Sequence, residues 1–354
     1  DWAQYEPISS SPTYYYKNKV PYAESWMLSL QRQLARNTVL SVSYVGTAGR
    51  NNMVIFPANP ANPSLCLKVS QPSEVASGSN VCGPYAETGT FTTASGQVIR
   101  ARQQLSAHFG STGWYRTAGT SNYNALEGSL QYSSGRSSLL VAYTYGKSMD
   151  DSSSPTEGVY PFDPMKEYAL SAFNVTNNFV ASYSYELPFD RVFSHPAWLT
   201  KGWVLSGITS FSTGFPVTIS ENDDNSLIGT TSLGPGAFLD EPNYTPGKLL
   251  AQTNPRNGGT YFNTSLFSLE QLGQFGNAKR RFFSGPGIDN WDMALSKTIR
   301  FTESKSLEIR FEAFNVFNHA QFDAPGGLIN SSTFGVVDSA RDPRIAQVSA
   351  KLHF

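Results

Sequence analysis

The sequence predicts an all-β, antiparallel fold that crosses a membrane as a β-barrel. Three observations predict it: apolar and polar residues alternate along most of the chain, the predicted strands are long, and short and long connections alternate. Strands of soluble proteins average about 5 to 6 residues, whereas a tilted membrane-spanning strand needs about 9 to 11. Because several predicted strands reach about 11 residues, their length favours a membrane.

The composition excludes several other classes of protein. The 354 residues are 13% aromatic and only 15% charged, which is unlike a disordered chain. Lys and Arg (26) nearly balance Asp and Glu (27), so no nucleic-acid partner is expected. No apolar run approaches the roughly 18 residues of a membrane-spanning helix. We treat residues 1–354 as a single β-barrel region.

Nine strands are predicted along the chain. The clearest is the last, where Ala350, Leu352 and Phe354 point to one face and Lys351 and His353 to the other. Aromatic residues near strand ends, such as Trp26 and Trp203, suit the headgroup level of a bilayer. The predicted strands are Tyr22–Leu34, Thr38–Ala48, Asn122–Tyr132, Ser137–Lys147, Asn174–Leu187, Gly202–Ile219, Trp291–Phe301, Ser306–Asn318 and Arg344–Phe354.

The connections between these strands indicate two different sides. Short connections (35–37, 133–136, 188–201 and 302–305) alternate with long ones (49–121, 148–173, 220–290 and 319–343). Outer-membrane barrels show this asymmetry, with short periplasmic turns and long extracellular loops. The long connections are rich in Gly, Pro, Ser and Asn and are expected to be solvated extracellular loops, chief among them 49–121 and 220–290. Residues 1–21 are then expected to be the remnant of another extracellular loop.

The two cysteines, Cys66 and Cys82, lie close together in the first long loop. No neighbouring residues complete a set of metal ligands, so we expect a disulfide, with two unpaired thiols as the alternative. Closing a loop of about 15 residues stabilises a fold by roughly 3 kcal/mol. Such a bond persists outside the reducing cytosol.

Several segments together resemble one family. They include PYAESWMLSLQRQLARNTVLSVSYVGTAGR near the start, NFVASYSYELPF in the middle, and FGNAKRRFFSGPGIDNWDMALSKTIRF with LEIRFEAFNVFNHAQF in the final third. The chain is similar in these stretches to Oar-like TonB-dependent receptors of the Gram-negative outer membrane. The resemblance implies the C-terminal portion of a 22-stranded transport barrel that contacts membrane lipid and lipopolysaccharide. The family's plug, early strands and TonB-contacting segment have no counterpart here, so contact with the TonB complex is expected only through that missing N-terminal region.

The end of the chain resembles an outer-membrane sorting signal. Ala350, Leu352 and Phe354 form an alternating apolar pattern that closes on an aromatic residue. The resemblance implies recognition by the barrel-assembly machinery, and the alternative is an ordinary final strand.

Candidates for chemistry are scattered, and we expect no enzyme, cofactor or resident metal. His108, His195, His319 and His353 lack the spacing of a zinc or catalytic motif. Two acidic groups, Asp150–Asp151 and the run Glu221, Asn222, Asp223, Asp224 and Asn225, could coordinate calcium, but solvated turns are the favoured interpretation. Lys279, Arg280 and Arg281 could meet lipopolysaccharide phosphates or an anionic substrate, although a solvated loop is again favoured.

The residues Glu308, Arg310 and Glu312 are expected to face the barrel lumen and to satisfy one another there. Two functions are consistent with the sequence: uptake of a substrate by an energised outer-membrane receptor, and a structural or adhesive barrel that presents binding loops. We also expect the strands at Trp26 and Leu352 to be open edges. An extra strand from Asp1–Val20 or from the region near Val98 would instead permit a small closed barrel.

Overall fold

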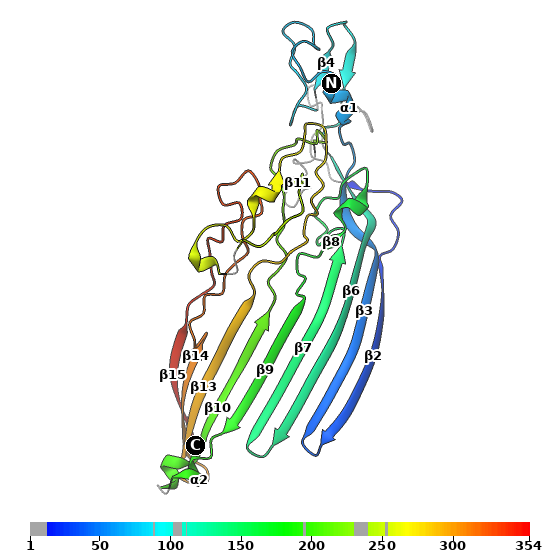
Figure 1. Cartoon of the computed structure of the whole chain (residues 1–354). Helices are drawn as coiled ribbons and strands as arrows, with labels where there is room; N and C mark the ends of the chain where they lie inside the picture. Colours follow the sequence, from blue (N-terminus) through cyan, green and yellow to red (C-terminus); the bar gives the residue numbers. More distant parts are fainter. Residues whose placement is uncertain are drawn as a thin grey trace.

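One large sheet dominates the computed structural model, which describes residues 13–87, 89–101, 108–110, 112–193, 196–229, 240–251 and 254–354. Its long strands run in the spatial order β15-β14-β13-β10-β9-β7-β6-β3-β2, and every neighbouring pair is antiparallel (Figure 1). The strands are β2 (Tyr22–Ala35), β3 (Thr38–Pro57), β6 (Gly113–Ser134), β7 (Ser137–Asp150), β9 (Asn177–Glu186), β10 (Trp203–Ser212), β13 (Ile288–Arg300), β14 (Ser306–Phe314) and β15 (Ile345–His353). All nine predicted strands are therefore confirmed.

Three boundaries differ from the prediction by seven residues or more. β3 continues to Pro57 and β6 begins at Gly113, because the two strands pair with each other along this whole extension. β10 ends at Ser212 rather than Ile219. Just after this end, Gly214 lies so close to Pro286 that a Cβ added to Gly214 would be 2.2 Å from the Pro286 carbonyl oxygen. The predicted loops 49–121 and 220–290 are thus corrected to 58–112 and 213–287.

Short and long connections lie at opposite ends of the sheet, as predicted. The short ones are residues 36–37, 135–136, 187–202 and 301–305, and the third contains the one-turn helices α2 (Phe189–Val192) and α3 (Ala197–Thr200). The C-terminus lies at the same end, near α2 (Figure 1). Among the described residues, no helix is both long enough and apolar enough to cross a bilayer.

The long connections form a folded layer at the other end of the sheet (Figure 1). We call the described residues of 58–112, 151–176, 213–287 and 315–344 the loop layer. Its elements are α1 (Pro63–Leu67), β4 (Thr90–Thr92), β5 (Val98–Arg100), η2 (Pro164–Glu167), β8 (Ala169–Leu170), β11 (Asn243–Tyr244), η3 (Pro255–Asn257), η4 (Thr264–Leu266) and β12 (Phe267–Ser268).

The loop layer contains the two larger buried apolar clusters of the described structure. One cluster surrounds the disulfide between Cys66 and Cys82 and includes Phe91 and Leu227. The second is aromatic, and the Phe262 ring meets those of Phe283 and Phe334 edge to face with centroids 5.2 Å apart. The expectation of solvated loops is therefore wrong, because these segments bury apolar side chains against one another.

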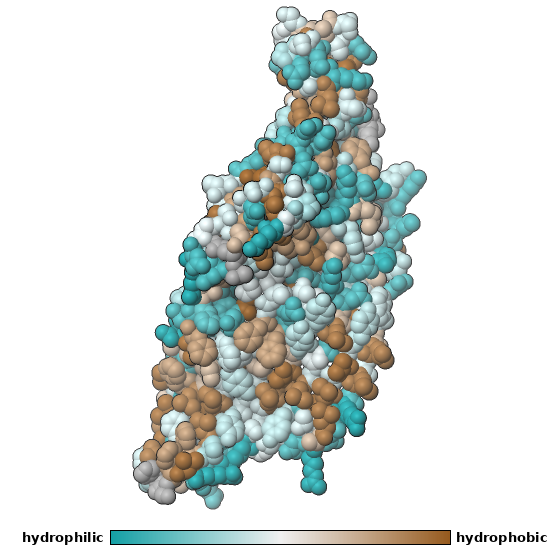
Figure 2. All heavy atoms as spheres, in the orientation of Figure 1, coloured by the Kyte–Doolittle hydropathy of each residue, from teal (hydrophilic) through white to brown (hydrophobic). Residues whose placement is uncertain are grey.

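The two faces of the sheet differ in chemistry. One cross-strand row carries Phe311, Leu295, Leu205 and Tyr185, and the next row, on the opposite face, carries Glu312, Ala294, Ser206 and Ser184. Apolar side chains gather over the part of the sheet nearest the short turns, whereas the surface toward the loop layer is more hydrophilic (Figure 2). This separation is the pattern of a membrane-spanning sheet with one wet face.

The sheet has two open edges among the described residues, as predicted. β2 pairs only with β3, and β15 pairs only with β14. The region near Val98 forms β5, which pairs with β4 and does not close the sheet. The short strand β1 (Thr13–Tyr14) pairs in parallel with β6, and residues 1–12 lie outside the described part of the chain.

Candidate functional site

A groove crosses β9, β10, β13 and β14, and its lining mixes polar side chains with apolar ones such as Ile208 and Phe314. It has a volume of about 390 Å³, and its lining includes Ser184, Ser206, Asp292, Arg310 and Glu312. Serine hydroxyls and charged groups can exchange hydrogen bonds with water or with a polar solute. The polar side chains of this groove are therefore suited to line an aqueous passage.

Two of the three predicted lumen residues meet in this groove. Arg310 Nε lies 2.5 Å from Glu312 Oε1, and Glu312 also accepts a hydrogen bond from the side chain of Gln347. Glu308 shares their face but lies beside His353, with 3.8 Å between its Oε2 and the imidazole Nε2. Arg310 and Glu312 therefore pair with each other while Glu308 does not join them, and the position of all three in a lumen stays a prediction.

A second site is a buried ion-pair network in the loop layer, directly above β7. Arg280 is 5% exposed and pairs with Asp150 and with Glu157, whose Oε2 lies 2.6 Å from its Nη1. Arg281 Nη2 lies 2.6 Å from Glu157 Oε1. The prediction of a solvated basic segment is wrong for both arginines, because they neutralise carboxylates from the end of β7 and from another loop.

This network shifts two carboxyl pKa values in opposite directions. Burial raises the pKa of Glu157, but the adjacent guanidinium groups of Arg280 and Arg281 outweigh it and leave the pKa below its usual value. Burial raises the pKa of Glu167 to about 8, with Arg280 opposing the shift only in part. Arg280 Nε donates to the backbone carbonyl of Glu167, at 2.9 Å, rather than to its side chain.

A third site is an acidic cluster formed by Glu221, Asp240 and Glu270. One carboxylate oxygen from each residue lies within 4.8 Å of the other two, and the residues are 0%, 1% and 6% exposed. The backbone amide of Glu221 donates to the carbonyl of Asp240 at 2.8 Å. Gly276 packs against the backbone at Glu241, and a Cβ added to Gly276 would lie 1.9 Å from the Glu241 carbonyl oxygen. The absence of a side chain at Gly276 lets the segment after Glu270 lie against the segment that contains Asp240.

The carboxyl groups of the acidic cluster are unequally satisfied. Asp240 accepts hydrogen bonds from the amide and hydroxyl of Ser226, at 3.0 and 2.7 Å. Within the described structure, no N–H or hydroxyl group donates to the carboxyl of Glu221 or of Glu270, and these two carboxyls face each other. Burial, followed by the neighbouring carboxyl of Glu270, raises the pKa of Glu221 to about 10, and burial raises the pKa of Asp240 to about 7.

The predicted acidic run does not act as one loop. Only Glu221 joins the acidic cluster, while Asp224 accepts hydrogen bonds from the amides of Ile228 and Gly229. Sequence reasoning missed Asp240, although it stands beside Glu241, and Glu270, which has no acidic neighbour in the sequence. Asp150 and Asp151 are also not solvated, being 2% and 3% exposed, so the turn interpretation is wrong for them as well.

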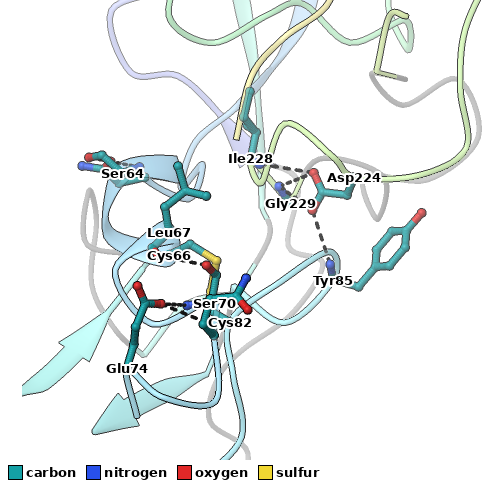
Figure 3. The surroundings of a disulfide bond; sticks show 12 residues. Ser64, Cys66, Leu67, Ser70, Glu74, Cys82, Tyr85, Asp224, Ile228 and Gly229 are labelled. Atoms are coloured by element: carbon teal, nitrogen blue, oxygen red, sulfur yellow. Dashed lines mark hydrogen bonds between the residues drawn. A yellow bond between two sulfur atoms is a disulfide. The ribbon is translucent and has the colours of Figure 1, made fainter. Parts of the chain in front are cut away.

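We call the described residues of 58–101, which surround the bond between Cys66 and Cys82, the disulfide lobe. This lobe contacts the segment that follows Glu221 (Figure 3). The Asp224 carboxylate accepts a hydrogen bond from the amide of Tyr85, at 3.5 Å, and the amide of Ala61 donates to the carbonyl of Ile228, at 2.9 Å. Leu227 is fully buried in the cluster around the disulfide. Residues 224–228 therefore join the lobe to the acidic cluster.

The remaining candidates do not form a site among the described residues. His319 lies beside Asp289, with 3.1 Å between Nδ1 and Oδ2, and His353 lies beside Glu308. His195 falls outside the described residues. Leu352 and Ala350 lie on the open-edge strand β15, and Phe354 follows that strand by one residue; Leu352 is 58% exposed and Phe354 93%. Their role in assembly stays a prediction.

Comparisons with known proteins identify the family. The model of the outer membrane beta barrel domain matches residues 3–347. The outer membrane transporter YddB from Escherichia coli is 12% identical (TM-score 0.49), with 97% of this chain and 34% of that one covered. The ferric-catecholate import receptor Fiu from E. coli K12 is 9% identical (TM-score 0.42), with 95% of this chain and 28% of that one covered. The FrpB iron transporter from Neisseria meningitidis is 11% identical (TM-score 0.41), with 97% of this chain and 33% of that one covered.

The chain thus spans about a third of the length of these solved structures. No curated protein is significantly similar to it in sequence. The family match covers nearly the whole chain and agrees with the long antiparallel strands, their two chemically different faces and the asymmetric connections. The chain belongs to the outer membrane beta barrel domain family and resides in the outer membrane.

Proposed function

We propose that the chain forms part of the wall of a TonB-dependent receptor barrel of the Oar-like group, through which a large or scarce substrate enters the cell. The observation that carries the proposal is the groove lined by Ser184, Ser206, Arg310 and Glu312, opposite an apolar face. A large barrel encloses a lumen whose walls need polar side chains, while its outer face needs apolar ones.

The proposal assigns an orientation and partners to each part. The short turns face the periplasm, the apolar face contacts lipid, and the loop layer lies outside among the lipopolysaccharide. Further strands at the edges of β2 and β15 complete a 22-stranded barrel, because backbone groups left unpaired in lipid cost several kcal/mol each. Contact with the TonB complex is made by a plug region, for which these residues contain no counterpart.

Uptake by cells tests this function even while the substrate is unidentified. Three strains of the source bacterium are compared for the compounds that they remove from the medium: the wild type, a deletion of this gene and a deletion of tonB. We expect at least one compound to remain in the medium of both deletion strains. Ser206→Trp, which fills the groove from its floor, should slow that uptake, whereas Ser304→Trp in a short turn should not.

Other outcomes would contradict transport. If the gene deletion changes adhesion to surfaces or cells while every compound is still consumed at the wild-type rate, the barrel is a structural or adhesive protein. Uptake that is lost in the gene deletion but unaffected in the tonB deletion would contradict energised transport.

A further inference from the structure

The acidic cluster brings together carboxylates from three separate stretches of the loop layer. Glu221 follows β10 by nine residues, Asp240 precedes β11, and Glu270 follows β12. Gly273, three residues after Glu270, donates its backbone N–H to the carbonyl of Asn225, at 2.6 Å. The backbone of all three stretches is therefore held by hydrogen bonds of its own, and the three carboxyl groups converge on a common point.

Two of the three carboxyl groups, those of Glu221 and Glu270, lack the hydrogen-bond donors that a buried carboxylate requires. Neither Glu221 nor Glu270 accepts a hydrogen bond from an N–H or hydroxyl group of the described residues, and each buried carboxyl has the other beside it. Leaving buried polar groups unsatisfied costs on the order of 1 to 3 kcal/mol each, and more for charged groups. Buried polar atoms without a partner are rare and point to an unseen water or ion.

The neighbouring ion-pair network shows what is missing. There, Glu157 faces two guanidinium groups, those of Arg280 and Arg281. At Glu221, the leading charged neighbours are other carboxyls, namely Glu270, Asp240 and Asp223. Within the part of the chain that the structure describes, the acidic cluster therefore gathers three buried carboxyl groups, none of which has an ion pair with a basic side chain.

We propose that Glu221, Asp240 and Glu270 bind a calcium ion that holds the loop layer together. Calcium takes carboxylate oxygens at about 2.3 to 2.6 Å, so two ligands on opposite sides of it are up to about 5 Å apart. The separations within 4.8 Å fit this range. Magnesium requires shorter bonds of about 2.0 to 2.1 Å in a strict octahedron, and zinc prefers nitrogen and sulfur ligands.

The ion would connect the centre of the loop layer to the disulfide lobe. Residues 224–228 begin three residues after Glu221. Leu227 belongs to the buried cluster around the disulfide. The Asp224 carboxylate accepts a hydrogen bond from the backbone amide of Tyr85 (Figure 3). Calcium thus holds Asp240 and Glu270 to a segment that is already fixed to the lobe. This role is structural and does not depend on whether the barrel transports a substrate.

Calcium titration of the detergent-purified protein tests the site. After treatment with EGTA, we expect isothermal titration with CaCl₂ to show one site per chain, and MgCl₂ to bind at least about tenfold more weakly. Glu221→Gln and Glu270→Gln should each weaken calcium binding by at least about tenfold. Asp338→Asn removes an exposed carboxyl of the same layer and should leave the calcium affinity unchanged. It therefore controls for a general effect of removing one negative charge.

Limited proteolysis separates loss of the ion from loss of the fold. Cleavage within residues 213–287 should be faster in EGTA than in calcium for the wild type. In Glu221→Gln it should be independent of calcium, while the sheet remains resistant. A wild-type protein that binds no calcium up to about 1 mM, or a Glu221→Gln variant that retains wild-type affinity, would overturn the proposal. If the variants fail to fold, the wild-type titration alone decides between these results.

Discussion

The sheet and the loop layer accommodate their polar groups in different ways. In the sheet, alternation sends Arg310 and Glu312 to a groove and Phe311 to the opposite face, so each side chain meets the surroundings that suit it. In the loop layer, Arg280 is buried against carboxylates from distant segments, and Glu221 is buried beside the carboxyls of Asp240 and Glu270. Order in the sheet is thus local and repetitive, whereas order in the loop layer rests on a few specific contacts.

The largest effect is expected where a single side chain neutralises two carboxylates. Arg280→Met leaves Asp150 and Glu157 buried with less compensation, and breaking a buried ion pair costs about 3 to 5 kcal/mol. We expect rapid proteolysis of the loop layer with an intact sheet. The matched control is Lys279→Met, because the Lys279 ammonium is exposed and contacts only the carbonyl of Lys166 among the described residues. Equal resistance of the two variants would show that the network is dispensable.

The sheet should respond to a charge according to the face that carries it. Leu295 lies near the middle of β13 on the apolar face, and arginine at the bilayer midplane costs about 2 to 4 kcal/mol. Leu295→Arg should therefore lower the folded fraction in outer membranes, measured by heat-modifiable migration on gels. Ser296→Arg, on the polar face one residue later, should fold normally. Similar losses in both variants would mean that the two faces do not differ.

Removing the disulfide should loosen one lobe and leave the rest intact. The double variant Cys66→Ser/Cys82→Ser loses a cross-link worth roughly 3 kcal/mol. We expect faster cleavage between residues 58 and 101 and unchanged resistance of the sheet. If hydrogen exchange in the lobe is the same with and without the bond, the apolar cluster around Phe91 suffices to hold it.

The last expected effect is a pH dependence that separates Glu167 from Glu157 and appears only when the pH is changed. The pKa of Glu167 is raised from 4.5 to about 8 on folding, so its contribution to stability is complete below pH 4.5 and is lost as the pH rises toward about 8. Glu167→Gln should flatten this decline, measured as protease resistance in calcium across this pH range. If protease resistance falls with pH as steeply in Glu167→Gln as in the wild type, the burial of the ionisable Glu167 carboxyl is contradicted.

The same sign argument runs in reverse for Glu157. Its pKa is lowered on folding, so its contribution is present above its unfolded pKa and is lost as the pH falls through the folded value. The loop layer should therefore also weaken in acid, and Glu157→Gln should remove that weakening.

The sequence predicted the sheet well because its signal is periodic and local. Each residue of β14 or β15 reveals its face through its immediate neighbours, and Cys66 has only one cysteine with which to pair. The loop layer offers no such signal. Arg280 and Asp150 lie 130 residues apart, and Glu221 meets Asp240 and Glu270 only because the backbone of three stretches converges. Acidic and basic residues in loops therefore looked solvated, although the fold buries them.

Cysteine labelling along β13 tests the central claim, that one face of the sheet meets lipid and the other lines an aqueous space. Single cysteines replace Asp292, Met293, Leu295 or Ser296 in turn, since the native Cys66 and Cys82 are bonded to each other. In isolated outer membranes, a water-soluble maleimide should label positions 292 and 296 quickly and positions 293 and 295 slowly. Equal labelling at all four positions, or the reverse alternation, would contradict this account of the fold and of the function proposed from it.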